Sequence, residues 1–263
     1  MIVRKAQAAI AKRLLPVAAE DAALEATFLL RASGFHSPYQ TVSETDAKAL
    51  DTLIERRLRG EPLQYVLGEW EFYGLPITVD PSVLIPRPET EILVEEALKY
   101  LNAPNRDVLD LCCGSGCIGI ALAVCGGANV TAADVSADAL ELAERNARRN
   151  GVSIKTVRSD FLDEVFGTFD MIVCNPPYLT QAEMDARDAS LRYEPALALD
   201  GGADGLTFYR RLAEDCRRVL RHGGTLLFEI GSTQREAVSA LFPDARCVED
   251  YGGRARVMVV EYD

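Results

Sequence analysis

The sequence has no apolar run that approaches the ~20 residues of a membrane-spanning helix. Its first residues, Met1 to Lys5, lack the apolar core and the small-residue cleavage site of a secretory signal peptide. Positive charge is also scarce, because 28 Lys and Arg face 40 Asp and Glu, which gives a net charge of −12. Binding to nucleic acid depends largely on Lys and Arg at phosphates. We therefore expect a cytoplasmic protein that has neither a membrane nor nucleic acid as a direct partner.

Histidine is nearly absent, since only His36 and His222 occur and they lie far apart in the sequence. The seven cysteines are odd in number, and Cys112, Cys113 and Cys117 crowd one predicted strand-to-helix junction. Such a set is no disulfide framework. A zinc site would need further ligands with the spacing of a second pair. We therefore expect no metal site, and we interpret the cysteines as small buried residues.

Residues 1–68 predict a small bundle of amphipathic helices, because apolar residues recur at helical spacing between short loops. Ser43 is placed to cap one of these helices and Gly60 to end it. Arg56, Arg57 and Arg59 form a local basic cluster, which we interpret as a solvated helix face. Nothing in this region resembles a catalytic motif. The expected apolar stripes are Ile10, Leu14 and Leu15; Leu24, Phe28 and Leu29; and Leu50, Leu53, Ile54 and Leu58.

Residues 69–89 have a different character, because aromatic and branched residues alternate loosely with polar residues and Gly, which predicts a β-hairpin linker. A helix is expected near Thr90. Farther on, strand and helix patterns alternate, which is typical of a doubly wound α/β domain and places a second domain at 90–263. A short turn at 251–253 separates the last two strands, so the sheet should end in an antiparallel hairpin. The expected strands lie near 107–111, 128–133, 154–158, 169–174, 225–230 and 254–260, with one more at 247–248.

The run 169–174 is short, apolar and β-branched, and it predicts a central parallel strand. It ends in Asn175-Pro176-Pro177-Tyr178, at the edge where open α/β folds hold their active sites. An amide or aryl amino nitrogen is a poor nucleophile because its lone pair is delocalised. The Asn175 side-chain oxygen and the Pro176 carbonyl would hold the two N–H bonds of such a group. Pro177 would stiffen the corner, and Tyr178 would offer a flat face. An ordinary loop start is the simpler interpretation, since Asn-Pro pairs also form turns.

A second motif, at 108–119, combines a strand, a glycine-rich turn and a helix start. Its glycines permit a tight turn and the close approach of a ligand, and 114–119 satisfies G-x-G-x-x-G, so a dinucleotide site must be considered. Asp134 ends the next strand, where it could accept hydrogen bonds from both ribose hydroxyls. Asp160-Phe161 follows the third strand and suits the edge and the face of an adenine. The turn residues expected to contact a cofactor are Cys112, Cys113, Gly114, Ser115 and Gly116.

Sites for NAD and for S-adenosylmethionine share these features, and three details favour S-adenosylmethionine. Asp110 directly precedes the turn, where a carboxylate could hold the ammonium group of the sulfonium ligand but would gain nothing beside a pyrophosphate. The fourth strand ends in the Asn175 motif rather than in hydride-transfer machinery, so we expect Asn175 to lie beside the cofactor as well as the substrate. The terminal hairpin suits a methyltransferase sheet.

Five segments together form a highly specific set. They are Leu84-Ile85-Pro86-Arg87-Pro88-Glu89-Thr90-Glu91, the Asp110–Gly116 turn, Asn175-Pro176-Pro177-Tyr178, Tyr193-Glu194-Pro195 with Ala198-Leu199, and Gly201-Gly202-Ala203-Asp204-Gly205-Leu206. Over nearly all of its length the chain resembles the protein-(glutamine-N5) methyltransferases of the PrmC/HemK type, which modify peptide chain release factors. It departs from the family's common Asp-Leu-Gly-Thr-Gly-Ser-Gly at Cys112 and Cys113, and it has Phe161 where some members have Trp.

The resemblance implies a class I S-adenosylmethionine-dependent methyltransferase, with a Rossmann-like seven-stranded sheet and an N-terminal all-α bundle that docks the substrate. It implies that S-adenosyl-L-methionine methylates the side-chain nitrogen N5 of a glutamine in the Gly-Gly-Gln loop of class 1 release factors, leaving S-adenosyl-L-homocysteine. Transfer would be direct and in line, and it would need no strong base. We expect a monomer. The expected catalytic and substrate-binding residues are Asn175, Pro176, Pro177 and Tyr178, with Arg87, Glu89 and Glu194 as further substrate contacts.

Three alternatives remain open. A related glutamine methyltransferase acts on a ribosomal protein and shares the Asn-Pro-Pro-Tyr motif, but that branch resembles Arg-Ser-Pro-Ile where this chain has 87–91. An adenine-N6 methyltransferase on nucleic acid faces the same chemical problem, although the acidic charge and the lack of a basic domain argue against it. A non-catalytic interaction module would bind the cofactor without turnover.

Overall fold

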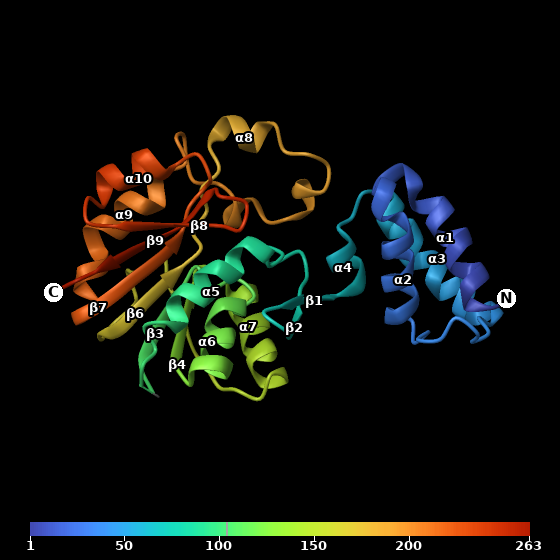
Figure 1. Ribbon diagram of the computed structural model, residues 1–263, viewed down its shortest axis with the longest axis horizontal. Coiled ribbons are helices and arrows are strands. Elements are labelled where there is room, and N and C mark those ends of the chain that lie inside the picture. Colours follow the sequence, from blue (N-terminus) through green and yellow to red (C-terminus); the bar gives the residue numbers. More distant parts are fainter. Residues whose placement is uncertain (104) are drawn as a thin grey trace. The chain divides into compact units, whose positions relative to one another are not determined.

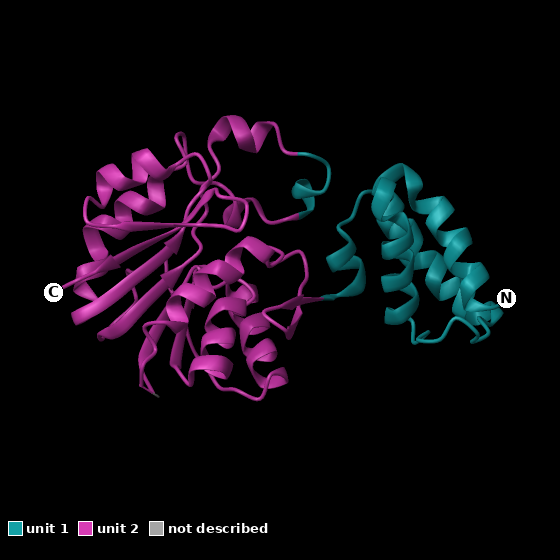
Figure 2. Cartoon of the chain, viewed as in Figure 1, with its two compact units in different colours: residues 1–69, 188–193 teal, residues 70–187, 194–263 magenta. Residues whose placement is uncertain are grey.

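The computed structural model describes residues 1–103 and 105–263, and the chain divides into two compact units (Figure 2). Unit 1 comprises residues 1–69 and 188–193, and unit 2 comprises residues 70–187 and 194–263. The segment 188–193 is distant in sequence from the rest of unit 1, and no sequence pattern indicated that it belongs there. No helix in the described ranges is long and apolar enough to cross a membrane.

Unit 1 is the helical bundle that the apolar spacing predicts. Ser43 begins its third helix with a capping box, which confirms the predicted cap. The Ser43 hydroxyl accepts a hydrogen bond from the backbone N–H of Asp46 at 3.2 Å, and the Asp46 carboxylate accepts one from the backbone N–H of Ser43 at 3.1 Å. The helices are α1 (Val3–Ala18), α2 (Ala22–Ala32), α3 (Glu44–Leu58) and α4 (Leu63–Leu67).

Two of the predicted apolar stripes are wrong in part. Leu15 and Leu24 are each 55% exposed, whereas Leu14, Ala26 and Leu29 are fully buried. Successive helical residues point about 100° apart, so Leu15 turns away from the face that buries Leu14. Leu24 lies two positions from Ala26 and therefore points to the opposite side of the helix. Small alanines thus occupy core positions that the sequence pattern assigned to leucine.

The basic cluster of unit 1 is not the solvated face that we expected. Arg57 has a side chain that is only 12% exposed, and its Nε and Nη2 donate to the Glu25 carboxylate at 2.8 and 3.0 Å. Arg56 donates in the same forked manner to Glu61, with Nε at 2.9 Å from Oε2. Only Arg59 is exposed. Two of the three arginines therefore hold the bundle together through bidentate ion pairs.

A β-hairpin begins at the boundary of the two units, with β1 (Glu69–Phe72) paired to β2 (Leu75–Thr78). Asn146, which is fully buried, fastens this hairpin within unit 2. Its side-chain oxygen accepts from the Thr78 backbone N–H at 2.8 Å, and its Nδ2 donates to the carbonyls of Thr78 and Ser115 at 3.0 Å each. The hairpin is thereby tied to the glycine-rich turn that carries Ser115.

Among the described residues of unit 2, seven strands form one sheet in the order β5-β4-β3-β6-β7-β9-β8. Strands β3 to β7 are parallel, and β9 pairs antiparallel with both β7 and β8, which confirms the predicted fold with its terminal hairpin. Helices α5, α6 and α7 lie on one side of the sheet, and α9 and α10 lie on the other (Figure 1).

The strands of this sheet are β3 (Asp107–Leu111), β4 (Asn129–Asp134), β5 (Lys155–Arg158), β6 (Phe169–Cys174), β7 (Leu220–Glu229), β8 (Arg246–Glu249) and β9 (Ala255–Glu261). The helices of unit 2 are α5 (Glu91–Leu98), α6 (Cys117–Gly126), α7 (Ala137–Arg149), α8 (Gln181–Asp185), α9 (Thr207–Asp215) and α10 (Arg235–Leu241). The core between the sheet and α9 and α10 is apolar, and it includes the fully buried aromatic residues Tyr209 and Phe228.

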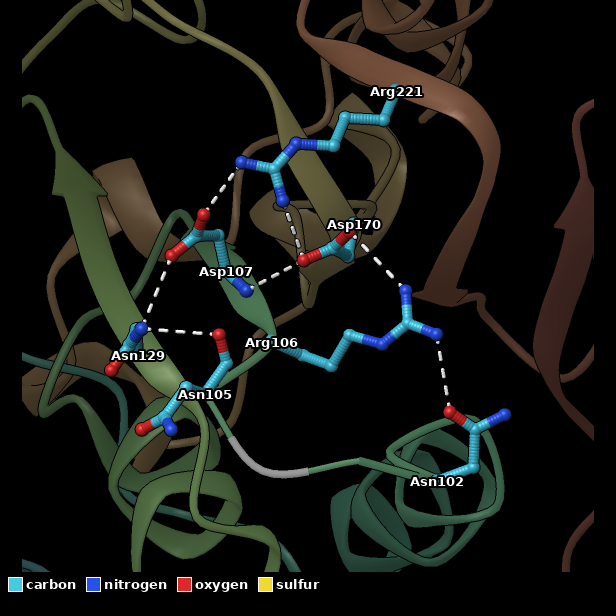
Figure 3. Close-up of polar contacts among 7 residues, drawn as sticks. All are labelled: Asn102, Asn105, Arg106, Asp107, Asn129, Asp170 and Arg221. Atoms are coloured by element: carbon cyan, nitrogen blue, oxygen red, sulfur yellow. Dashed lines mark hydrogen bonds and ion pairs between the residues drawn. The ribbon is translucent and has the colours of Figure 1, made fainter.

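Charged residues tie the strands together at the edge of the sheet where the parallel strands begin (Figure 3). The Asp170 carboxylate accepts hydrogen bonds from the Asp107 backbone N–H at 2.8 Å, from Arg221 at 2.6 Å and from Arg106 at 3.3 Å. Arg221 also donates to the Asp107 carboxylate at 2.6 Å. Burial alone would raise the pKa of Asp170, but these donors outweigh it and hold that pKa below its usual value.

Replacing Asp170 with Asn should lower the free energy of unfolding by about 1–2 kcal/mol, the modest end of the range for charged hydrogen bonds, because the arginine partners are 39% and 41% exposed. The folded-state pKa is lowered, so this stabilisation is present above the unfolded pKa of ~3.9 and is lost as the pH falls through the folded value. Urea unfolding of wild type and D170N at about pH 7 and about pH 3 measures the change. The matched control is E214Q, at an exposed carboxylate. The account would be contradicted if D170N lost the same free energy of unfolding, relative to wild type, at both pH values.

Candidate active site

The register of the parallel strands decides which residues meet at the opposite edge of the sheet. Leu111 of β3 pairs with Ala133 of β4 and with Cys174 of β6. The residue that follows Leu111 therefore lies between Asp134 and Asn175, the next positions on the two neighbouring strands. Parallel strands end at a common edge, and this edge is where ligands bind in open α/β sheets.

A cavity of about 540 Å³ opens at this edge, within the usual size range of small-molecule sites. It gathers most of the predicted site residues, but the rest lie beneath or beside it. The predicted residues that line it are Arg87, Cys112, Cys113, Gly114, Ser115, Asp134, Asp160, Phe161, Asn175 and Pro177. Those that do not line it are Glu89, Asp110, Gly116, Pro176, Tyr178 and Glu194.

The turn after β3 is built from left-handed backbone. Cys112, Gly114 and Gly116 have φ of 57°, 52° and 77°. The left-handed conformation costs a non-glycine residue roughly 1–2 kcal/mol. The backbone of Cys112 is therefore strained in a conformation that glycine would adopt without strain. The backbone N–H of Gly114 donates to Asp134 at 2.9 Å, which ties the turn to the end of β4.

Asp110 lies under the turn rather than in the cavity. It is fully buried, and its Oδ2 accepts a hydrogen bond from the backbone N–H of Gly119 at 2.9 Å. Its Oδ1 has no hydrogen-bond partner among the described residues. Burial raises the pKa of Asp110 to about 7, opposed in part by the Gly119 bond and reinforced by the charge of Asp134. The unpaired oxygen is a buried acceptor that a cationic donor would satisfy.

Asp134 faces the cavity and is held by backbone donors. Its two oxygens accept from the N–H groups of Gly114 and Ser136 at 2.9 Å each. Burial raises its pKa, although these bonds oppose the rise. A carboxylate oxygen has lone pairs beyond the one already used, so each can accept a further hydrogen bond from a ligand.

Asp160 and Phe161 form the wall of the cavity beside β5, together with two residues that the sequence analysis missed. Arg211 of α9 donates to the Asp160 carboxylate at 2.7 Å, and its guanidinium lies 4.8 Å from the centre of the Phe161 ring. The ring of Phe208 lies 5.8 Å from that of Phe161. No short motif marks Phe208 or Arg211, because a helix far along the chain brings them to the cavity.

Asn175 is half-buried and lines the cavity, and its Nδ2 donates to the Thr90 hydroxyl at 3.2 Å. Tyr178 does not line the cavity, and its hydroxyl donates to the buried carboxylate of Glu229 at 3.3 Å. Pro176 and Pro177 are buried, and among the described residues no donor reaches the Pro176 carbonyl. Neither Thr90 nor Glu229 was expected to be a site residue from its sequence context. An acidic residue at the end of a buried strand was the available sign for Glu229, as it was for Asp134.

Glycines at 201 and 205 explain how the corner after Asn175 is supported. A Cβ atom on Gly201 would lie 2.7 Å from the Cα of Tyr178, and one on Gly205 would lie 2.4 Å from the Tyr178 carbonyl oxygen. Leu179 also exchanges backbone hydrogen bonds with Leu199 and Gly201, at 2.9 Å each. Only a glycine-containing loop can approach the Tyr178 backbone this closely.

Of the three further residues expected to bind substrate, Arg87 alone faces the cavity. It forms an ion pair with Glu194, which is buried and also accepts a hydrogen bond from the Ile85 backbone N–H at 3.0 Å. Glu194 therefore anchors the segment that carries Arg87. Glu89 is exposed and lies outside the cavity lining.

Comparison with protein families gives two matches that together span most of the chain. The family described as the PrmC N-terminal domain matches residues 5–68, and the family described as the methyltransferase small domain matches residues 88–191.

Comparison with individual proteins gives relatives that align over almost the whole length. The release factor glutamine methyltransferase of Agrobacterium fabrum is 39% identical, over 94% of this chain and 93% of that one. The enzyme of the same name from Geobacter sulfurreducens is 41% identical, over 91% and 89%. Among solved structures, the 16S rRNA N2 G1207 methyltransferase of T. thermophilus in complex with AdoMet and guanosine has a TM-score of 0.55 at 19% identity, over 74% of this chain and 50% of that one. This structural likeness shows a shared methyltransferase fold.

The glycine turn is tested by comparing two glycines with nearly the same backbone. Gly116 and Gly151 have φ of 77° and 73°. A Cβ on Gly116 would lie 2.9 Å from the Cβ of Ala143, whereas a Cβ on Gly151 would meet nothing within 4 Å. Both G116A and G151A should pay about 1 kcal/mol for the left-handed backbone, and G116A should lose about 1–3 kcal/mol more through overpacking. Urea unfolding of the two variants checks this difference. Equal losses would mean that α7 does not constrain the turn.

Proposed function

Because the chain belongs to the family of release factor glutamine methyltransferases, we propose that it methylates the side-chain nitrogen N5 of the glutamine in the Gly-Gly-Gln loop of class 1 release factors. The methyl donor is S-adenosyl-L-methionine, and the product is S-adenosyl-L-homocysteine. One observation carries the proposal: the Asn175 amide opens into the same cavity as the glycine turn and Asp134. The cavity thus joins a candidate cofactor site to a group that can hold a planar amide.

The residues of the cavity fit S-adenosylmethionine in charge and shape. Asp134 has lone pairs available for the ribose hydroxyls, and Phe161 provides an apolar wall for the adenine. Asp110 lies beneath the turn and outside the cavity lining, so its negative charge, rather than a direct contact, favours the ammonium group of the methionine part. A pyrophosphate would place negative charge near the buried carboxylate of Asp110 and the half-buried carboxylate of Asp134, which disfavours a dinucleotide. When bound, S-adenosylmethionine supplies an electrophilic methyl group on a sulfonium ion.

The protein groups around Asn175 orient the acceptor nitrogen. The Asn175 side-chain oxygen and the Pro176 carbonyl oxygen accept hydrogen bonds from the two N–H bonds of the glutamine amide. This fixes the nitrogen in line with the methyl group and favours the pyramidal geometry of attack. Methylation makes the nitrogen acidic, so the proton leaves afterwards and no strong base is required. The buried prolines 176 and 177 keep the two acceptors at a fixed spacing and help to exclude water.

Residues 1–68, which make up most of unit 1, are the substrate-docking domain in this proposal, and residues 69–89 serve as the linker to the catalytic domain at 90–263. A release factor presents a large folded surface, and docking of that surface provides binding energy that a short loop peptide cannot. The enzyme acts as a monomer and makes no direct contact with nucleic acid.

The proposed function is tested with radiolabelled S-adenosylmethionine and three substrates. These are an intact class 1 release factor, the same factor with its loop Gln replaced by Glu, and a short Gly-Gly-Gln peptide. We expect label in the intact factor, none in the substituted factor, and a much higher KM for the peptide. Label that persists in the substituted factor would disprove the site of methylation. A peptide KM equal to that of the protein would disprove docking.

Two substitutions should separate catalysis from cofactor binding. N175A should lower kcat by about 10²–10³ and leave the Kd for S-adenosylmethionine nearly unchanged, because it removes an acceptor used mainly in the transition state. D134A should weaken cofactor binding, since each charge-assisted bond to a ribose hydroxyl contributes roughly 1.5–3 kcal/mol. Calorimetry and steady-state kinetics on both variants measure these effects, with E214A, at an exposed carboxylate outside the cavity lining, as the control. The assignment of roles would be contradicted by a loss of cofactor affinity in N175A or by unchanged affinity in D134A.

A further inference from the structure

A buried carboxylate lies behind Asn175, at the end of β7. Glu229 is 1% exposed, and its Oε2 accepts a hydrogen bond from the Thr90 hydroxyl at 2.6 Å. Thr90 is also buried, at 2% exposure, and its hydroxyl oxygen lies 3.2 Å from the Nδ2 of Asn175. The three side chains form one hydrogen-bonded row from the core of the sheet to the cavity.

Thr90 directly precedes α5, a position where a threonine hydroxyl commonly caps the helix. Its side chain makes no such cap. The hydroxyl is committed instead to Glu229 and Asn175, two residues that are distant from it in sequence and converge at the site. The Thr90 hydroxyl therefore links residues at the ends of two strands and does not cap its own helix.

The direction of each hydrogen bond in the row follows from the chemistry of its members. An ionised carboxylate only accepts hydrogen bonds, so Thr90 must give its single hydroxyl proton to Glu229. The Thr90 oxygen can then only accept from Asn175, and the group that faces it must be the NH₂ of that amide. The Asn175 oxygen consequently points away from Thr90 and toward the cavity that Asn175 lines.

The charge on Glu229 is what makes this direction unique. Burial raises its pKa, but the Thr90 hydroxyl, the charge of Arg256 and the Tyr178 hydroxyl favour the ionised form. Arg256 Nη1 lies 3.9 Å from Glu229 Oε1, and the Tyr178 hydroxyl donates to the same oxygen at 3.3 Å. Arg256 is itself only 12% exposed and is also paired with Asp250 at 3.1 Å. Two other negative charges, those of Glu89 and of Asp250, lie nearby and disfavour the ionised form of Glu229.

We propose that Thr90 and Glu229 are positioning residues that hold the Asn175 amide with its oxygen toward the substrate. The inference rests on the proposed function, in which that oxygen accepts a hydrogen bond from the glutamine NH₂. The opposite orientation would place an NH₂ group against the NH₂ of the substrate, which gives two donors and no acceptor. Without the row, the Asn175 amide would populate both orientations and only a fraction of the enzyme would be competent.

The main test replaces the hydroxyl of Thr90 while preserving the shape of the side chain. T90V should lower kcat about tenfold with an unchanged Kd for S-adenosylmethionine, because one orienting hydrogen bond is lost. T90S, which keeps the hydroxyl, should recover most of the wild-type kcat. T90V combined with N175A should be no slower than N175A alone, since Thr90 acts only through Asn175.

A second readout needs no substrate. The side-chain ¹⁵N–¹H resonances of Asn175, assigned by their loss in N175A, should move in T90V and return toward the wild-type position in T90S. E229Q should move them as well, because a Gln amide can donate to Thr90 and release the hydroxyl to turn toward Asn175. If T90V does not fold, as judged by its Tm, E229Q takes its place in both measurements.

Either of two results would overturn the proposal: a folded T90V with wild-type kcat and unshifted Asn175 resonances, or losses in T90V and N175A that add in the double variant. Additive losses would mean that Thr90 merely fastens the start of α5 to β7. The resonance measurement also separates this inference from the proposed function. A wild-type enzyme that fails to label a release factor disproves the function, whereas the Asn175 resonances still decide the orientation.

Discussion

The parallel pairing of β3 with both β4 and β6 is the constraint on which the site depends. Because Leu111 is in register with Ala133 and with Cys174, the next residue on each strand reaches the same edge at the same level. A shift of register by one residue would send the Asp134 and Asn175 side chains to opposite faces of the sheet. The ion-pair cluster around Asp170 at the other edge ties β3, β6 and β7 together where they begin. The cluster at the strand starts thus fixes the strand alignment that brings Asp134 and Asn175 together at the strand ends.

Carboxylates that are shielded from water make the site selective for a positively charged ligand. Asp110, Asp134 and Glu229 each end or border a strand of the sheet, and burial raises the pKa of each. Glu229 is satisfied by protein groups, Asp134 is held by backbone N–H groups, and Asp110 retains one oxygen that has no partner in the described part of the chain. A ligand that carries an ammonium and a sulfonium brings positive charge to this edge, so the same desolvation that destabilises the free carboxylates favours that ligand. Asp110 and Asp134, which favour a cationic cofactor, and Glu229, which orients the Asn175 amide, therefore belong to one group of acidic residues at this edge of the sheet.

The strand-to-helix alternation and the short final turn predicted the sheet of unit 2 correctly, because parallel strands buried on both faces have a distinct apolar pattern. The Asn175 and Asp134 positions were also foreseeable, since each polar residue ends an apolar strand. The burial of Leu15 and Leu24 was predicted wrongly, because hydrophobicity alone does not reveal which helical face is covered. Thr90, Phe208 and Arg211 were missed because their partners at the site are 47 or more residues away along the chain, and no local pattern records such contacts. Glu229 did carry a local sign, since it ends a buried strand as Asp134 ends its own, but that sign was not used. The membership of segment 188–193 in unit 1 was not predicted either, because the residues that it contacts there are also far away in the sequence.

The central claim is that the Asn175 edge presents a side-chain amide nitrogen to the methyl donor. The most direct measurement is acid hydrolysis of a release factor methylated with a labelled methyl group, followed by identification of the labelled product. Hydrolysis of an N5-methyl amide breaks the amide bond and releases methylamine, and the account predicts that the label appears there. Label that stays on an amino acid or on the backbone nitrogen, or that is released as methanol from an ester, would contradict it.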